Sequence, residues 1–416
     1  MDHAGGGRGP AVATAAPRIG AGVAAVAVAS AITSALGYLV PVLGARTLAP
    51  SDLGALNSVL AIAGIVAVPS MGLQIAVAVH RAKRPGATAR RAGWLTAAAC
   101  AALVALLSPV AGPLLDVPVT VMLLLAAYTG AIVVAGRWLG ELQGDERFLR
   151  LAAGMAVLAA GRYGGLSAGL LLGAGVTGSM LIGTATALLI PAVLAVLARS
   201  IRGVRSGLTI TARQVFTACS ATLAMLVVSY ADFLLARYLL PGDASGAYAV
   251  GTVLTKGAIW APQVVTVLVL PRLAQGSKRA LLLALGLVAV SGTVLVTASA
   301  VAGGLAFRVA GGEDYVDLGR YAPVFAATGA VYALVFVLIN AQVAAGAKWP
   351  SAPLWTGTAV LVVTAVWVVP HTFTAVMWCA FGTAALILVA TAVPNVARHR
   401  RIRVAPPSGT KAAVSD

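Results

Sequence analysis

The sequence predicts an all-α integral membrane protein, with about 12 transmembrane helices in two parallel-repeat six-helix lobes around a central cavity. Three observations lead to this fold: the composition, a succession of long apolar runs and an internal duplication. Of the 416 residues, 60% are hydrophobic and only 10% are charged, whereas about a quarter of the residues of a soluble protein are charged. Such a composition cannot cover a water-soluble surface, so we expect the chain to cross a membrane repeatedly.

Long apolar runs follow one another through the chain, each close to the length of about 20 residues that a helix needs to cross a bilayer. The first run, at residues 20–43, is too long for the core of a signal peptide, so we expect a retained helix. The other spans expected in the first half cover residues 53–79, 92–115, 117–136, 151–172 and 177–198. Those of the second half cover residues 216–236, 247–270, 281–307, 321–347, 352–369 and 372–396. Only Pro370 and His371 separate the last two runs, which could instead form a re-entrant pair.

The positive charges alternate between the two sides of the expected membrane. With the N-terminus in the cytoplasm, 23 of the 29 lysine and arginine residues fall in inside segments, and two, Arg162 and Lys256, fall within spans. The four outside bases are Arg46, Arg237, Arg308 and Arg320. Because basic residues favour cytoplasmic loops, this split predicts two cytoplasmic termini and an even number of helices.

The net charge of +17 does not indicate nucleic acid as a partner. Nucleic-acid binding needs a basic face exposed to solvent, whereas the bases here sit in short clusters between apolar runs. We expect these clusters to set the topology and to contact anionic membrane lipids.

A short polar hairpin occurs twice. The motif Ala-Arg-x-Leu-x-Pro-x-Asp occupies residues 45–52 and recurs 191 residues later at 236–243. Six expected helices separate the two copies, and an even number keeps both copies in the same orientation, as in a parallel repeat. We therefore expect a disordered cytoplasmic tail at 1–19, an N-terminal six-helix lobe at 20–206, a C-terminal six-helix lobe at 207–396 and a basic cytoplasmic tail at 397–416.

Three charged residues lie within the expected spans. Arg162 is near the middle of the fifth helix and Lys256 near the middle of the eighth, where placing a base costs roughly 2.5–3.5 kcal/mol. Both should therefore face a protein interior or an aqueous cavity, where they would bind an anionic group of a substrate. Asp232, at a shallower depth in the seventh helix, offers the alternative of an ion pair with Lys256, and the two roles do not exclude each other.

The sequence shows no pattern typical of an enzyme. It has no nucleophile with a base at a suitable spacing, no phosphate-binding glycine loop and no buried carboxylate pair. The cysteines Cys100, Cys219 and Cys379 all lie in apolar runs and the four histidines are scattered, so we expect no disulfide, no metal site and no cofactor. Among the prolines within spans, Pro262 is the best candidate for a bend, although proline is also simply common in membrane helices.

Several motifs resemble those of a known family. The second half carries Asp232, Arg237, Gly246, Tyr248, Trp260, Pro262, Leu270 and Pro271 in an order and spacing that look like polysaccharide flippases. A first-half counterpart runs from Arg46 to Gly54, and Leu-Gln-Gly-x-x-Arg-Phe at 142–148 is also similar. Over residues 20–395 the chain resembles the polysaccharide (O-antigen type) flippase branch of the multidrug/oligosaccharidyl-lipid/polysaccharide exporter superfamily.

The resemblance implies alternating access and a polyprenyl-pyrophosphate-linked oligosaccharide as substrate, turned from the cytoplasmic to the outer leaflet of a bacterial inner membrane. A polysaccharide polymerase would then be a partner. Arg162 and Lys256 would suit the pyrophosphate by their charge, although neither position matches a signature of the family.

Two other hypotheses compete. A cation-coupled drug or metabolite antiporter of the same fold would use Asp232 as its proton or sodium site, but the charges in mid-span are mainly basic. A membrane scaffold without transport activity has little reason to bear the insertion cost of those charges.

Overall fold

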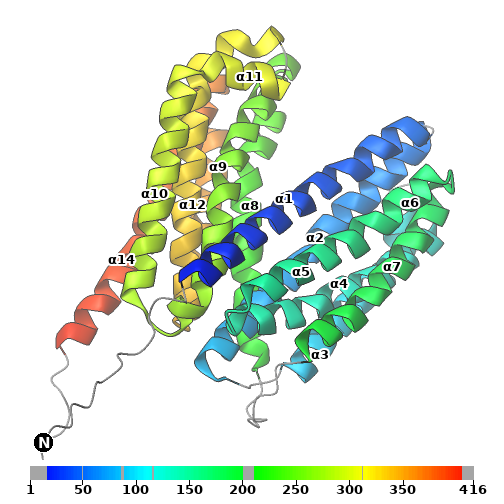
Figure 1. Ribbon diagram of the computed structural model, residues 1–416. Helices are drawn as coiled ribbons and strands as arrows, with labels where there is room; N and C mark the ends of the chain where they lie inside the picture. Colours follow the sequence, from blue (N-terminus) through cyan, green and yellow to red (C-terminus); the bar gives the residue numbers. More distant parts are fainter. Residues whose placement is uncertain are drawn as a thin grey trace, which may run out of the picture. The chain divides into compact units, whose positions relative to one another are not determined.

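The computed structural model describes residues 16–48, 50–85, 89–114, 117–199, 210–311 and 313–404. Within these ranges every regular element is a helix (Figure 1). The expected tail at 1–19, the expected tail at 397–416 and the expected lobe boundary at 206 lie wholly or largely outside the described residues. Contacts group the chain into two compact parts, unit 1 (Met1–Thr222 and Val267–Gly276) and unit 2 (Leu223–Thr266 and Ser277–Asp416).

Unit 1 is built around one central helix. Its helices are α1 (Ala16–Thr47), α2 (Pro50–Lys83), α3 (Arg90–Leu114), α4 (Val119–Gly144), α5 (Phe148–Ala159), the π-helical turn η1 (Ala160–Gly164), α6 (Gly165–Leu171) and α7 (Gly175–Ala198). The central helix α4 packs against α2, α3 and α7. The elements α5, η1 and α6 follow one another without a break and form one rod (Figure 1).

Glycines bring α2 and α4 close together. Gly136, Gly140 and Gly144 recur every four residues along α4, so they lie on one face of that helix. A side-chain carbon at Gly140 would lie 2.5 Å from the Gln74 carbonyl oxygen of α2. Small residues at this spacing let two membrane helices touch backbone to backbone, where van der Waals packing rather than the hydrophobic effect holds them.

Unit 2 repeats the plan of a central helix. Its remaining elements are α10 (Lys278–Val301), α11 (Gly303–Gly311), the 3₁₀ helix η2 (Glu313–Tyr321), α12 (Ala322–Ala344), α13 (Ala352–Val363), the π-helical turn η3 (Thr364–Val368) and α14 (Phe373–Val404). The central helix is α12, which packs against α10 and α14. Two helices are shared: α8 (Ala212–Leu239) begins in unit 1, and the end of α9 (Gly242–Ala274) belongs to unit 1.

The prediction of an all-helical membrane protein is confirmed. A helical segment covers each expected span, and nine helices of the described chain are long and apolar enough to cross a membrane, or ten if the bent α9 counts as one span. The apolar helix Ala352–Val368 is shorter than the others. Several helices run past the expected spans, as α4 does to Gly144 and α14 to Val404. The span expected at 281–307 is divided, because α10 ends at Val301 and α11 begins at the Gly303-Gly304 pair.

The bend expected at Pro262 is present. The segments Ala244–Ile259 and Val264–Ala274 of α9 meet at an angle of 42°. Proline lacks the N–H that would close the preceding helical turn, and its ring clashes with the carbonyl four residues before it.

Candidate functional site

Arg162 lies in the π-helical turn η1, between α5 and α6. Its side chain is partly buried, and its Nη2 lies 3.4 Å from the Ala63 carbonyl oxygen of α2. The guanidinium carbon lies 5.0 Å from the centroid of the Tyr163 ring. In the part of unit 1 that the structure describes, no carboxylate forms an ion pair with this arginine. The structure therefore places Arg162 within a helical rod of the unit, with carbonyl and aromatic partners.

Lys256 lies on α9 and is partly buried. Its ammonium nitrogen lies 3.8 Å from the centroid of the Tyr230 ring and 5.6 Å from that of Phe233, both on α8. A cation over an aromatic face is attracted by the ring quadrupole, by about 0.5–2 kcal/mol depending on desolvation. Two aromatic rings, rather than a carboxylate, are therefore the direct partners of this base.

Asp232 is buried in unit 2, with 2% of its surface exposed. The Tyr248 hydroxyl of α9 donates to its Oδ2 at 3.4 Å. The Tyr332 hydroxyl of α12 is close enough to the Asp232 carboxylate for the two groups to interact electrostatically. This hydroxyl is buried and has no hydrogen-bond partner among the described residues. Lys256 is near enough for its charge to act on the carboxylate, but the two groups form no ion pair within 4.0 Å in the described chain.

The candidates thus fall into two separate surroundings. Asp232 and Lys256 lie in unit 2, where the structure brings them into the same neighbourhood, and Arg162 lies in unit 1. The described residues hold no group of three or more histidine, cysteine or acidic side chains that could bind a metal ion.

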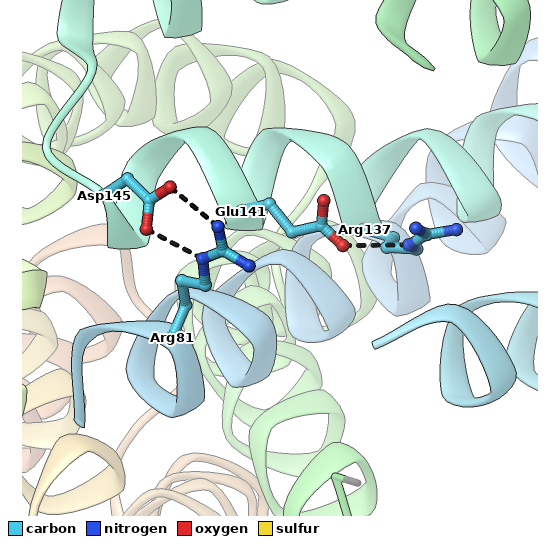
Figure 2. A network of polar contacts seen from close by, with 4 residues as sticks. All are labelled: Arg81, Arg137, Glu141 and Asp145. Atoms are coloured by element: carbon cyan, nitrogen blue, oxygen red, sulfur yellow. Dashed lines mark hydrogen bonds and ion pairs between the residues drawn. The ribbon is translucent and has the colours of Figure 1, made fainter. Parts of the chain in front are cut away.

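A polar network at the ends of α2 and α4 was missed by sequence reasoning. Arg81 of α2 forms two hydrogen bonds with the Asp145 carboxylate, from Nε at 2.8 Å and from Nη2 at 3.0 Å, and Arg137 pairs with Glu141 one turn apart on α4 at 3.0 Å (Figure 2). The Arg81 side chain is only 4% exposed. One feature of the sequence could have indicated this network, the four-residue spacing of Arg137 and Glu141, which brings the two side chains together on a helix.

The network continues toward the end of α9. Gln143 accepts a hydrogen bond from Gln74 at 2.8 Å and donates to the Val267 carbonyl at 2.9 Å, and Arg272 pairs with Glu146 at 3.3 Å. A cavity of about 450 Å³ opens beside these residues and is lined by charges of both signs. Its mixed lining does not favour a ligand of one charge, and the expected topology places it at the cytoplasmic end.

No protein-family model and no curated protein sequence matches the chain. Solved structures do match it over most of its length. One is an outward-facing multidrug resistance MATE family transporter of the MOP superfamily, with a TM-score of 0.71 at 14% identity over 92% of this chain and 97% of that one.

Two further matches have the same character. A MATE transporter of Vibrio cholerae gives a TM-score of 0.69 at 14% identity, over 94% of this chain and 97% of that one. The other is a MOP superfamily transporter from Pyrococcus furiosus, with a TM-score of 0.69 at 14% identity over 92% of this chain and 95% of that one. For that protein, a reversed polarity of the binding pocket suggests a different function. The chain therefore has the fold of these transporters.

Proposed function

We propose that the chain is a transporter, and not an enzyme, that moves a polyprenyl-pyrophosphate-linked oligosaccharide across a bacterial inner membrane by alternating access. The shared fold supports transport in general, and the expected distribution of bases supports cytoplasmic termini. The observation that carries the choice of cargo is the state of Arg162 and Lys256, the two bases within spans. Neither forms an ion pair with a carboxylate in the described residues.

A base within a membrane helix that forms no direct ion pair with a carboxylate is available to an anionic ligand. A base at the bilayer centre costs roughly 2.5–3.5 kcal/mol, and the tyrosine rings beside Arg162 and Lys256 offset only part of that cost. Pyrophosphate offers several charged oxygens, and hydrogen bonds between an ionised donor and an ionised acceptor are about twice as strong as neutral ones. A cargo with this group would supply an anionic partner to either base.

The test starts from a strain that lacks the gene. We expect a polyprenyl-pyrophosphate oligosaccharide to accumulate on the inner leaflet, detectable by mass spectrometry of the lipid fraction. Wild-type protein should clear it, and Arg162→Ala and Lys256→Ala should each clear it more slowly at equal expression. Arg150→Ala is the matched control, since Arg150 is an exposed base on the same rod as Arg162. A normal lipid profile in the deletion strain would overturn the proposed cargo.

Buried Asp232 favours one second candidate, a cation-coupled drug or metabolite antiporter. Its carboxylate, the Tyr248 hydroxyl and the buried Tyr332 hydroxyl supply oxygen atoms in an interior site of unit 2. Such a site would bind a proton or a sodium ion in exchange for the cargo. Asp232→Asn should then abolish uptake of a cationic drug into inverted vesicles that is driven by a proton or sodium gradient. Unchanged gradient-driven uptake would exclude this candidate.

A further inference from the structure

We infer that the π-helical turn η1 is a support for Arg162, and that Tyr128 and Thr186 are the residues that position it. The inference rests on the proposed function, because it assigns positioning residues to one of the two bases of that site. It starts from the backbone of the turn. A π-helical turn shifts the hydrogen bonds of an α-helix by one residue and so disturbs the pairing of its carbonyl groups.

Side chains from the two flanking helices bond the carbonyls of this turn. The Tyr128 hydroxyl of α4 donates to the Arg162 carbonyl at 2.9 Å. The Thr186 hydroxyl of α7 lies 3.0 Å from the Gly161 carbonyl oxygen and 3.0 Å from the Gly183 carbonyl oxygen of its own helix, so its one hydrogen is shared between the turn and α7. In a membrane interior no water is at hand to bond a freed carbonyl, so each such bond stabilises the turn against a regular α-helix. The two donors hold consecutive carbonyls, one of them that of the arginine itself.

Glycines allow α7 to approach the turn closely enough for the threonine to reach it. A side-chain carbon at Gly165 would collide with the Thr186 hydroxyl, and one at Gly161 would collide with Ile190. Gly164 has no neighbour within 4 Å of such a carbon, so the approach is confined to one side of the turn. The glycines therefore fix which side of the rod meets α7, while the Arg162 guanidinium reaches the Ala63 carbonyl of α2.

The second half offers an internal comparison. The turn η3 lies 204 residues after η1, in the corresponding helix of the repeat, and one of its carbonyls, that of Val366, contacts His371 Nε2 at 3.2 Å. This turn contains no base. The π-helical turn is thus shared by both halves, whereas an arginine placed in it, with a buried tyrosine on its carbonyl, is particular to the first.

The experiment separates positioning from cargo. Tyr128→Phe and Thr186→Val each remove one donor and keep the shape of the side chain. Thr184→Val is the control, since the Thr184 hydroxyl bonds the Leu124 and Met180 carbonyls and none in η1. We expect both test variants to clear the lipid-linked oligosaccharide about two- to ten-fold more slowly, and Tyr128→Phe to have no further effect when Arg162 is already alanine.

A second readout does not depend on transport. With the three native cysteines replaced, Arg162→Cys reports the position of residue 162 through its rate of reaction with a small thiol reagent. We expect Tyr128→Phe and Thr186→Val, but not Thr184→Val, to change that rate. An unchanged rate would overturn the positioning role whatever the cargo. If Tyr128→Phe clears the lipid normally while Arg162→Ala clears it slowly, the positioning role of Tyr128 is overturned and the proposed function stands. If Arg162→Ala itself clears the lipid normally, the result counts against the proposed function alone.

Discussion

The ammonium nitrogen of Lys256 lies 3.8 Å from the centroid of the Tyr230 ring. The ring face, rather than the hydroxyl, meets the charge, so Tyr230→Phe should keep transport close to wild type. Tyr230→Leu removes the aromatic face and should lower transport about two- to thirty-fold, the range that corresponds to a cation–π energy of about 0.5–2 kcal/mol. Clearance of the lipid-linked oligosaccharide at equal expression measures both. Equal loss in the two variants would show that the ring does not act on Lys256.

Exchange of Asp232 and Lys256 tests whether the two residues work as an ion pair. The structure brings their charges near each other without direct contact, since the carboxylate bonds Tyr248 and the ammonium lies over Tyr230. A carboxylate at position 256 would meet the negative face of that ring. We therefore expect the exchanged variant to transport no better than Lys256→Ala. Recovery of wild-type transport by the exchange would establish a functional pair.

The fold could be predicted from the sequence because a membrane leaves few choices. A backbone in lipid must satisfy its own hydrogen bonds, so each long apolar run becomes a helix, and hydropathy alone finds it. Pro262 likewise predicts its bend, because the loss of an N–H acts locally. Helix lengths at the ends were less predictable, as at Val301, where a glycine pair rather than a polar loop ends the helix.

The surroundings of the candidate residues could not be predicted, because they depend on contacts between distant segments. Arg81 and Asp145 are 64 residues apart in sequence, and the sequence alone predicts that each is a charged residue of a loop. Hydropathy does not register a π-helical turn, and nothing local to Arg162 indicates that Tyr128 bonds its carbonyl. Sequence reasoning found the bases within spans from their insertion cost but not the tyrosines that contact them.

Arg81 and Asp145 should contribute strongly to stability. Removal of one partner from a buried ion pair leaves a buried charge uncompensated and costs about 3–5 kcal/mol. Arg81 is nearly fully buried, so Asp145→Ala should lower the midpoint of thermal unfolding in detergent markedly. Arg272→Ala is the control, because its pair with Glu146 is half exposed and exposed pairs contribute about 0–1 kcal/mol. Equal midpoints for the two variants would contradict the burial of the first pair.

The close approach of α2 and α4 predicts opposite effects for two glycine substitutions. A methyl group at Gly140 would meet the Gln74 backbone, which has no room to move, so Gly140→Ala should cost about 1–3 kcal/mol of overpacking strain. Gly64, on α2, has no neighbour within 4 Å of an added carbon. Gly64→Ala should therefore be neutral or stabilise by up to about 1 kcal/mol through helix propensity. Unfolding midpoints in detergent distinguish the two, and tolerance of alanine at Gly140 would argue against the tight α2–α4 contact.

The orientation of the chain can be measured at two exposed bases. Arg90 begins α3 and belongs to the basic cluster expected inside, whereas Arg308 lies on α11 near the acidic Glu313 and is expected outside. In a variant without native cysteines, Arg308→Cys should react with an impermeant maleimide in intact spheroplasts. Arg90→Cys should react only after the membrane is permeabilised. Both positions lie at helix ends rather than in the middle of a span, so the labelling pattern reports the orientation that the positive-inside bias predicts. Labelling of Arg90→Cys from outside would invert the topology and place the Arg81–Asp145 network on the outer face.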